Sequence, residues 1–154
     1  MYRVLLLLEL HPEHRMPVDQ LRILDFYFLF PHLLADVKLM RGHIRWKRKL
    51  AATRSKYNHV PAPQMLLSQI RPLQEVALLH LAGEGYFDKQ ALDEKLAIKT
   101  SRSVPPTITK LFSEQSDERE LAEFLAKEVS KIKLTGVDGL KDRTGLLEYR
   151  YDPD

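Results

Sequence analysis

The clearest pattern of apolar positions lies between Pro17 and Pro31, in the run VDQLRILDFYFLF. Leu21, Leu24 and Phe28 recur at helical spacing on one face, and other apolar side chains cover most of the remaining surface. Proline is tolerated in the first turn of a helix but not in its interior, so the two prolines predict the ends of one helix of about four turns. A helix that is apolar on nearly every side is buried on several sides.

Asp25 is the only charged residue between Ile23 and Pro31, and we expect it to face solvent or to meet a basic side chain. The same helix carries four aromatic residues, which are Phe26, Tyr27, Phe28 and Phe30. They fit either the protein's own core or a partner-binding surface, where aromatic side chains are enriched. Because most helices of a small domain keep an exposed face, we predict that at least one of the four is exposed in the isolated chain and covered by a partner.

The first ten residues, MYRVLLLLEL, form a mostly apolar run of strand length. Periodicity does not separate a strand from a helix in such a run, so it fits a buried strand or an arm that lies on a partner. We therefore expect residues 1–62 to hold this strand or arm, the aromatic helix and a basic segment.

Residues 63–154 predict a mainly helical region with a small β part, which makes the whole chain mainly α in an α+β arrangement. A helix over Pro63–Ala82 is expected to restart at Pro72, and Asp88 is a good N-cap for the next helix. Glycine-rich turns then precede a predicted strand at Leu146–Tyr151. This order of helices and a closing hairpin predicts a winged-helix-like C-terminal half.

The composition excludes several classes of site and of protein. The chain has 154 residues, a formal net charge of +3 and no cysteine, which excludes disulfides, thiol catalysis and cysteine-based zinc sites. The apolar run Val4–Leu8 is too short to span a membrane and lacks a signal-peptide cleavage site. We expect a cytoplasmic protein without membrane contact.

Positive charge is concentrated in the middle of the chain, where residues 37–74 contain no acidic residue. The candidate nucleic-acid-binding residues are Arg41, Arg45, Lys47, Arg48, Lys49, Arg54 and Lys56. They predict a basic helix or helix-loop that either is a solvated face or contacts nucleic acid or an acidic protein surface. Trp46 within the run supports a contact.

No motif of an enzyme stands out. There is no phosphate-binding loop, and His11 and His14 do not have the spacing of a zinc-binding helix. Asp138 and Glu148 are only faintly similar to the acidic pair of a metal-dependent nuclease, which needs clustered carboxylates. We therefore expect a non-enzyme without cofactor or metal.

Three features together resemble a known family: the run LRILDFYFLFP at 21–31, the basic middle, and the ending GLKDRTGLLEYRY at 139–151. They are similar to the middle components of ABC-three-component systems. These small proteins are encoded between an SMC-like or ABC ATPase and an effector in bacterial conflict systems, of which the Lamassu type is a relative. The resemblance implies a non-catalytic adaptor that joins the ATPase to a nuclease-type effector in anti-phage defence, and it implies no catalytic residues.

A DNA-binding winged helix-turn-helix regulator is the alternative. Such a regulator usually carries its cations on the recognition helix and the wing. The candidate recognition helix, Ser103–Ser113, contains only Lys110, whereas the densest charge lies upstream in Arg41–Lys56. This placement favours the adaptor, with any DNA contact being independent of sequence.

Overall fold

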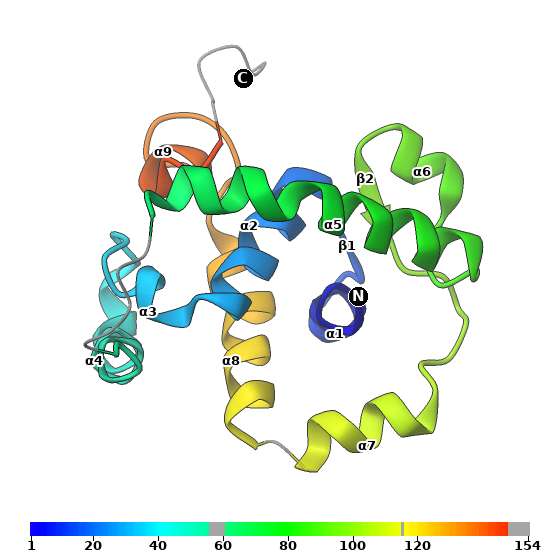
Figure 1. Cartoon of the computed structure of the whole chain (residues 1–154), viewed down its shortest axis with the longest axis horizontal. Coiled ribbons are helices and arrows are strands. Elements are labelled where there is room, and N and C mark those ends of the chain that lie inside the picture. Colours follow the sequence, from blue (N-terminus) through cyan, green and yellow to red (C-terminus); the bar gives the residue numbers. More distant parts are fainter. Residues whose placement is uncertain (56–60, 115, 148–154) are drawn as a thin grey trace.

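The computed structural model describes residues 1–55, 61–114 and 116–147, and within these ranges the chain is mainly helical with one small antiparallel sheet (Figure 1). The helices are α1 (Tyr2–Leu10), α2 (Val18–Leu29), α3 (Pro31–Leu34), α4 (Ile44–Ala52), α5 (Pro63–Gly83), α6 (Lys89–Asp93), α7 (Pro106–Glu114), α8 (Ser116–Lys127) and α9 (Leu140–Thr144). Two short 3-10 helices, Arg41–His43 and Val129–Lys131, precede α4 and follow α8. The expected mainly α class with a small β part is confirmed.

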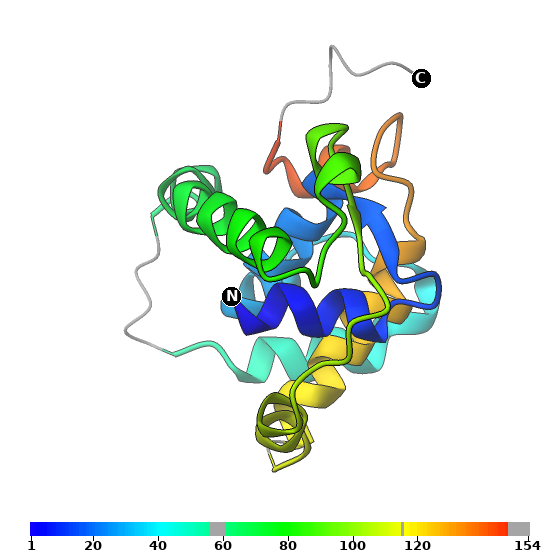
Figure 2. The ribbon, with the colours of Figure 1, turned by 90° about the vertical axis from the view of Figure 1, so that its right-hand side faces the viewer.

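Helix α1 lies at the centre of the molecule, surrounded by α2, α5 and α8 (Figures 1 and 2). The five consecutive residues Val4–Leu8 are all buried, which a helix achieves only when neighbours cover it on every side. The expectation of a strand or an arm for this segment is therefore wrong. Leucine favours the helix intrinsically, and the surrounding helices supply the packing that the apolar run alone did not reveal.

The prediction that Pro17 and Pro31 mark the two ends of one helix is confirmed. Helix α2 begins directly after Pro17, and Pro31 opens the short α3 after a break at Phe30. Ten of its residues, Val18 and then Gln20–Phe28, are buried. The helix therefore belongs to the interior on nearly all of its faces.

The two strands come from distant parts of the chain. Strand β1 (Arg15–Pro17) pairs antiparallel with β2 (Leu96–Ile98), with Met16 opposite Ala97. The backbone N–H of Val18 donates to the carbonyl of Lys95 at 2.9 Å, so the sheet also fixes the start of α2. One continuous core runs from Val4 to Leu146 and draws on both predicted parts of the chain.

The C-terminal half differs from the sequence expectation in two places. Helix α5 runs unbroken through Pro72. The segment expected to be a turn before the wing is helix α9, which Gly145 ends in a left-handed conformation at φ 62°. The predicted wing strand falls largely on residues 148–151, which lie outside the described residues, so the winged-helix likeness stays a prediction.

Candidate functional site

The aromatic residues of α2 contribute mainly to the protein's own core. Phe26, Tyr27 and Phe28 keep only 0, 2 and 8 % of their surface exposed. The rings of Phe26 and Tyr27 meet edge to face at 5.3 Å between centroids, and burial raises the pKa of the Tyr27 hydroxyl above its ordinary value. Phe30 is half-buried, so it is the one of the four with surface left for a partner.

Asp25 lies within a buried polar cluster that joins three helices. Its carboxylate is 1 % exposed and accepts hydrogen bonds from Arg3 Nε of α1 at 2.8 Å and from Gln74 Nε2 of α5 at 2.9 Å. The expectation that Asp25 meets a basic side chain is confirmed. The cluster holds α5 against α1 and α2 because a buried carboxylate is stable only with charged or hydrogen-bonding partners.

The inner side of α5 packs on the core through Leu67, Leu78 and Leu81, whereas its outer side is also apolar. We call this outer side the α5 face and define it by Met65, Leu73, Val76 and Leu79, whose exposed fractions are 58, 71, 65 and 56 %. Several large apolar side chains exposed on one helix are a feature of protein–protein interaction sites. The sequence analysis did not predict this exposed apolar side of the helix.

The spacing along the α5 face is that of a helix-packing seam. Met65, Pro72 and Leu79 recur every seven residues, and Val76 falls between the last two. This alternation of four and three residues keeps side chains on one stripe that a second helix can follow. On a helical wheel of α5, this stripe lies opposite the buried leucines. The sequence therefore contained a pattern of two apolar sides on one helix.

Further apolar surface continues from α5 towards the N-terminus. A hollow of about 220 Å³ between α1, α2 and α5 is lined by Met1, Leu29 and Leu73 among others. Met1 and Leu29 also line a groove of about 590 Å³ that reaches Leu111 of α7. Met1, Leu29 and Leu111 are themselves exposed, which extends the apolar surface beyond the α5 face.

The basic segment forms the predicted helix, but part of its charge is neutralised by acidic residues from elsewhere in the chain. Lys49 pairs with Glu120 of α8, and Arg54 pairs with Asp36 at 2.7 Å. The absence of nearby acids in the sequence was therefore misleading, because folding brings acidic residues from outside the segment to it. Lys56 lies outside the described residues.

The remaining basic residues are more accessible. Arg41, Arg45 and Arg48 are exposed and recur at helical spacing, and within the described part of the chain no acidic side chain pairs with them. Lys47 is half-buried. The arginines form one positive edge of the molecule, on the 3-10 helix before α4 and on α4 itself.

Trp46 is not available to stack on a nucleic-acid base. Its indole stacks on Phe124 of α8, with 4.3 Å between centroids and an interplanar angle of 12°, while Lys49 lies over the same indole. The aromatic residue in the basic run thus anchors α4 to α8, and Trp46 no longer supports a nucleic-acid contact.

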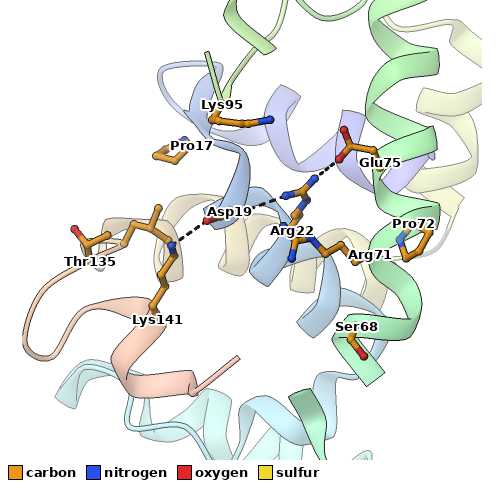
Figure 3. A pocket seen from close by; sticks show the side chains of 11 residues that line it. Pro17, Asp19, Arg22, Ser68, Arg71, Pro72, Glu75, Lys95, Thr135 and Lys141 are labelled. Atoms are coloured by element: carbon orange, nitrogen blue, oxygen red, sulfur yellow. Dashed lines mark hydrogen bonds and ion pairs between the residues drawn. The ribbon is translucent and has the colours of Figure 1, made fainter. Parts of the chain in front are cut away.

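A chain of ion pairs links α9, α2 and α5 beside the α5 face (Figure 3). Lys141 Nζ lies 2.9 Å from Asp19 Oδ2, and Arg22 pairs with both Asp19 and Glu75. The side chains of Lys141 and Arg22 are only 5 and 9 % exposed. They form the floor of a pocket of about 750 Å³, which the sequence analysis did not anticipate.

Among the residues that the structure describes, no three histidine or acidic side chains gather closely enough to hold a metal ion. Of the acidic pair that is faintly similar to a nuclease site, Asp138 has its Oδ1 atom 3.5 Å from Lys38 Nζ. Glu148 lies outside the described ranges. In the same ranges no helix has the length and apolar character needed to cross a membrane.

Comparison with known protein families gives a match over nearly the whole chain. The family model described as ABC-three component (ABC-3C) system Middle Component 5 matches residues 1–152. Neither a curated protein nor a solved structure matches the chain.

Proposed function

Because the chain belongs to the family of middle component 5 of ABC-three-component systems, we propose that it is a non-catalytic adaptor, joining an SMC-like or ABC ATPase to a nuclease-type effector in anti-phage defence. The family match covers nearly the whole chain, so the proposal concerns the entire molecule. We place the assembly in the cytoplasm, in keeping with a chain that contains no cysteine.

The observation that carries the proposal is the α5 face. Leu73 and Val76 are 71 and 65 % exposed although each would gain free energy from burial, at about 25 cal/mol per Å² of apolar surface. The helix beneath is held in place by Gln74, which is 4 % exposed and donates to Asp25. The face is therefore formed in advance and binds without first having to order, which lowers the cost of association.

An adaptor needs a second surface for its second partner. The arginines Arg41, Arg45 and Arg48 lie on α4 and on the 3-10 helix before it, and α4 lies away from most of α5 (Figure 1). They present positive charge around one exposed apolar residue, Ile44. We assign the α5 face to a helix of one subunit and the positive edge to an acidic surface of the other. Phe30 is half-buried, and we keep its partner-binding role as part of the proposal.

The test uses the chain co-expressed with the ATPase and the effector encoded beside it. We expect the double variant Leu73→Asp/Val76→Asp to lose association with one subunit, because truncating an interface anchor costs roughly 2 kcal/mol or more of binding free energy. Size-exclusion chromatography and pull-down measure association, and the melting temperature of the isolated variant reports its fold.

Val137→Asp is the matched control, since Val137 is an equally apolar residue with 93 % exposure that lies in the loop before α9. It should leave both association and melting temperature unchanged. Phe30→Ala tests the remaining aromatic candidate in the same assay. Full association of the Leu73→Asp/Val76→Asp variant with both subunits contradicts the role of the α5 face.

A further inference from the structure

We propose that the pocket between α2, α5, α9 and the turn before β2 binds a compact phosphate-bearing anion. The pocket has a volume of about 750 Å³, within the range of small-molecule sites in proteins. Four cationic side chains and two carboxylates line it, which leaves a net charge of +2. This inference is separate from the adaptor role, because it concerns a ligand of the isolated chain.

The floor of the pocket is electrically balanced and fixed. Arg22 and Lys141 supply two positive charges, and Asp19 and Glu75 supply two negative charges that pair with them (Figure 3). Since both cations are more than nine-tenths buried, their positions are set by the fold rather than by solvent. The floor thus contributes fixed positive charges that the paired carboxylates offset.

The excess charge comes from the rim. Arg71 on α5 and Lys95 in the turn between α6 and β2 are exposed, line the same pocket, and pair with no acidic group in the described ranges. Two unbalanced cations above a balanced floor create a positive potential that favours an anion. The guanidinium of an arginine can donate two hydrogen bonds to one phosphate group, and a lysine ammonium can bind another of its oxygen atoms.

Two further observations concern the cations at the base and the rim of the pocket. Arg22 Nε is buried and has no hydrogen-bond partner among the described atoms, so the guanidinium at the base of the pocket is not fully paired. Lys95 adopts φ 63°, a left-handed conformation that glycine or asparagine adopts more easily. Lys95 directly follows the C-cap of α6, and its side chain extends over the pocket in Figure 3.

The lining selects the kind of anion. No aromatic residue lines the pocket, so no ring is present for a base to stack on. The carboxylates of Asp19 and Glu75 are paired with Arg22 and Lys141, so the net positive charge comes from two cations alone, Arg71 and Lys95. A short oligophosphate, free or as the tail of a nucleotide, matches a net charge of +2, whereas a duplex presents a long row of phosphates that two cations do not cover.

Isothermal titration calorimetry of the full chain at constant ionic strength tests the proposal. Pyrophosphate is the main probe, and inorganic phosphate, ADP and a short DNA duplex are the further arms. We expect saturable binding of pyrophosphate that weakens about tenfold or more in Arg71→Gln/Lys95→Gly. Glycine at 95 accepts the positive φ, so the melting temperature of this variant should not fall.

Lys89→Gln/Lys127→Gln removes the same charge from exposed positions outside the pocket and outside the positive edge, and it should leave pyrophosphate binding unchanged. ADP binding with equal dependence on Arg71 and Lys95 would assign the site to nucleotide tails, and binding of pyrophosphate alone would assign it to the free anion. Absence of saturable binding, equal weakening in both double variants, or binding of the duplex alone through Arg71 and Lys95 would overturn the proposal.

Discussion

Asp25 shows how one residue fixes the arrangement of several helices. Its carboxylate is almost fully buried between Arg3 of α1 and Gln74 of α5, so three helices depend on one charge. Breaking a buried, hydrogen-bonded charge pair leaves polar groups without partners, which costs more than losing a solvent-exposed pair. Since Gln74 lies on the buried side of α5, the stability of this cluster also positions the α5 face.

We expect Asp25→Ala to lower the free energy of unfolding by about 2–3 kcal/mol, because the buried amide of Gln74 loses one of its two acceptors and keeps only the carbonyl of Arg22, while Arg3 loses its ion pair. Urea denaturation measures the change. Asp36→Ala is the matched control, since Asp36 and Arg54 form an exposed pair that contributes only about 0–1 kcal/mol. Equal losses in the two variants would show that the buried cluster has no special role.

At the scale of the element, α5 contains a proline in its middle and still forms one helix of 21 residues. Pro72 cannot donate the backbone hydrogen bond that a helix interior requires. The helix continues because Pro72 is exposed, so its ring points away from the core, while Leu67 on one side of it and Leu78 on the other pack against the interior. Tertiary contacts therefore offset a strong local preference for a break.

We predict that Pro72→Ala raises the stability of the isolated chain by about 1–3 kcal/mol, because alanine restores the missing hydrogen bond and has the highest helix propensity. The melting temperature should rise accordingly. Pro63→Ala serves as the control, since Pro63 lies in the first turn, where proline is tolerated and no comparable gain follows. A lower melting temperature for Pro72→Ala would mean that the proline ring itself supports the fold.

At the scale of the molecule, opposite charges meet between α4 and α8. Lys49 lies near Glu120 and Asp117, and His43 lies 3.6 Å from Glu128. These contacts leave the arginines on the outer side of α4 as the concentrated positive edge. Among the described residues, this edge has no free aromatic residue and no helix or strand placed to contact bases in a DNA groove. We therefore expect it to bind phosphate or carboxylate groups rather than specific bases.

If the positive edge binds DNA, Arg41→Gln/Arg45→Gln/Arg48→Gln should weaken binding equally for unrelated sequences. The dependence of affinity on salt should also become flatter, because each phosphate that the protein neutralises contributes about 0.9 to the log-log slope. Fluorescence anisotropy at several salt concentrations measures both effects. The control is Lys49→Gln/Arg54→Gln, which should change the slope less because both residues are already paired with acids. Weaker binding confined to one DNA sequence would favour the winged-helix regulator instead.

The sequence by itself determined those features that local chemistry controls. Pro17 and Pro31 bound α2 as expected, because proline restricts its own backbone whatever surrounds it. Asp88 caps α6, with its carboxylate accepting from the N–H of Ala91 at 2.8 Å, since capping involves only neighbours in the chain. The family resemblance at 21–31 and 139–151 agrees with the match over residues 1–152.

Only the tertiary structure decided which apolar residues are covered and which charges are paired. The run Val4–Leu8 is a central helix because other helices surround it, and Val76 is exposed although its sequence neighbour Ala77 is buried. Glu120 neutralises Lys49 across a sequence separation of 71 residues, and Lys141 reaches Asp19 from the opposite end of the chain. Burial and ion pairing depend on the three-dimensional path of the backbone, which periodicity and composition do not specify.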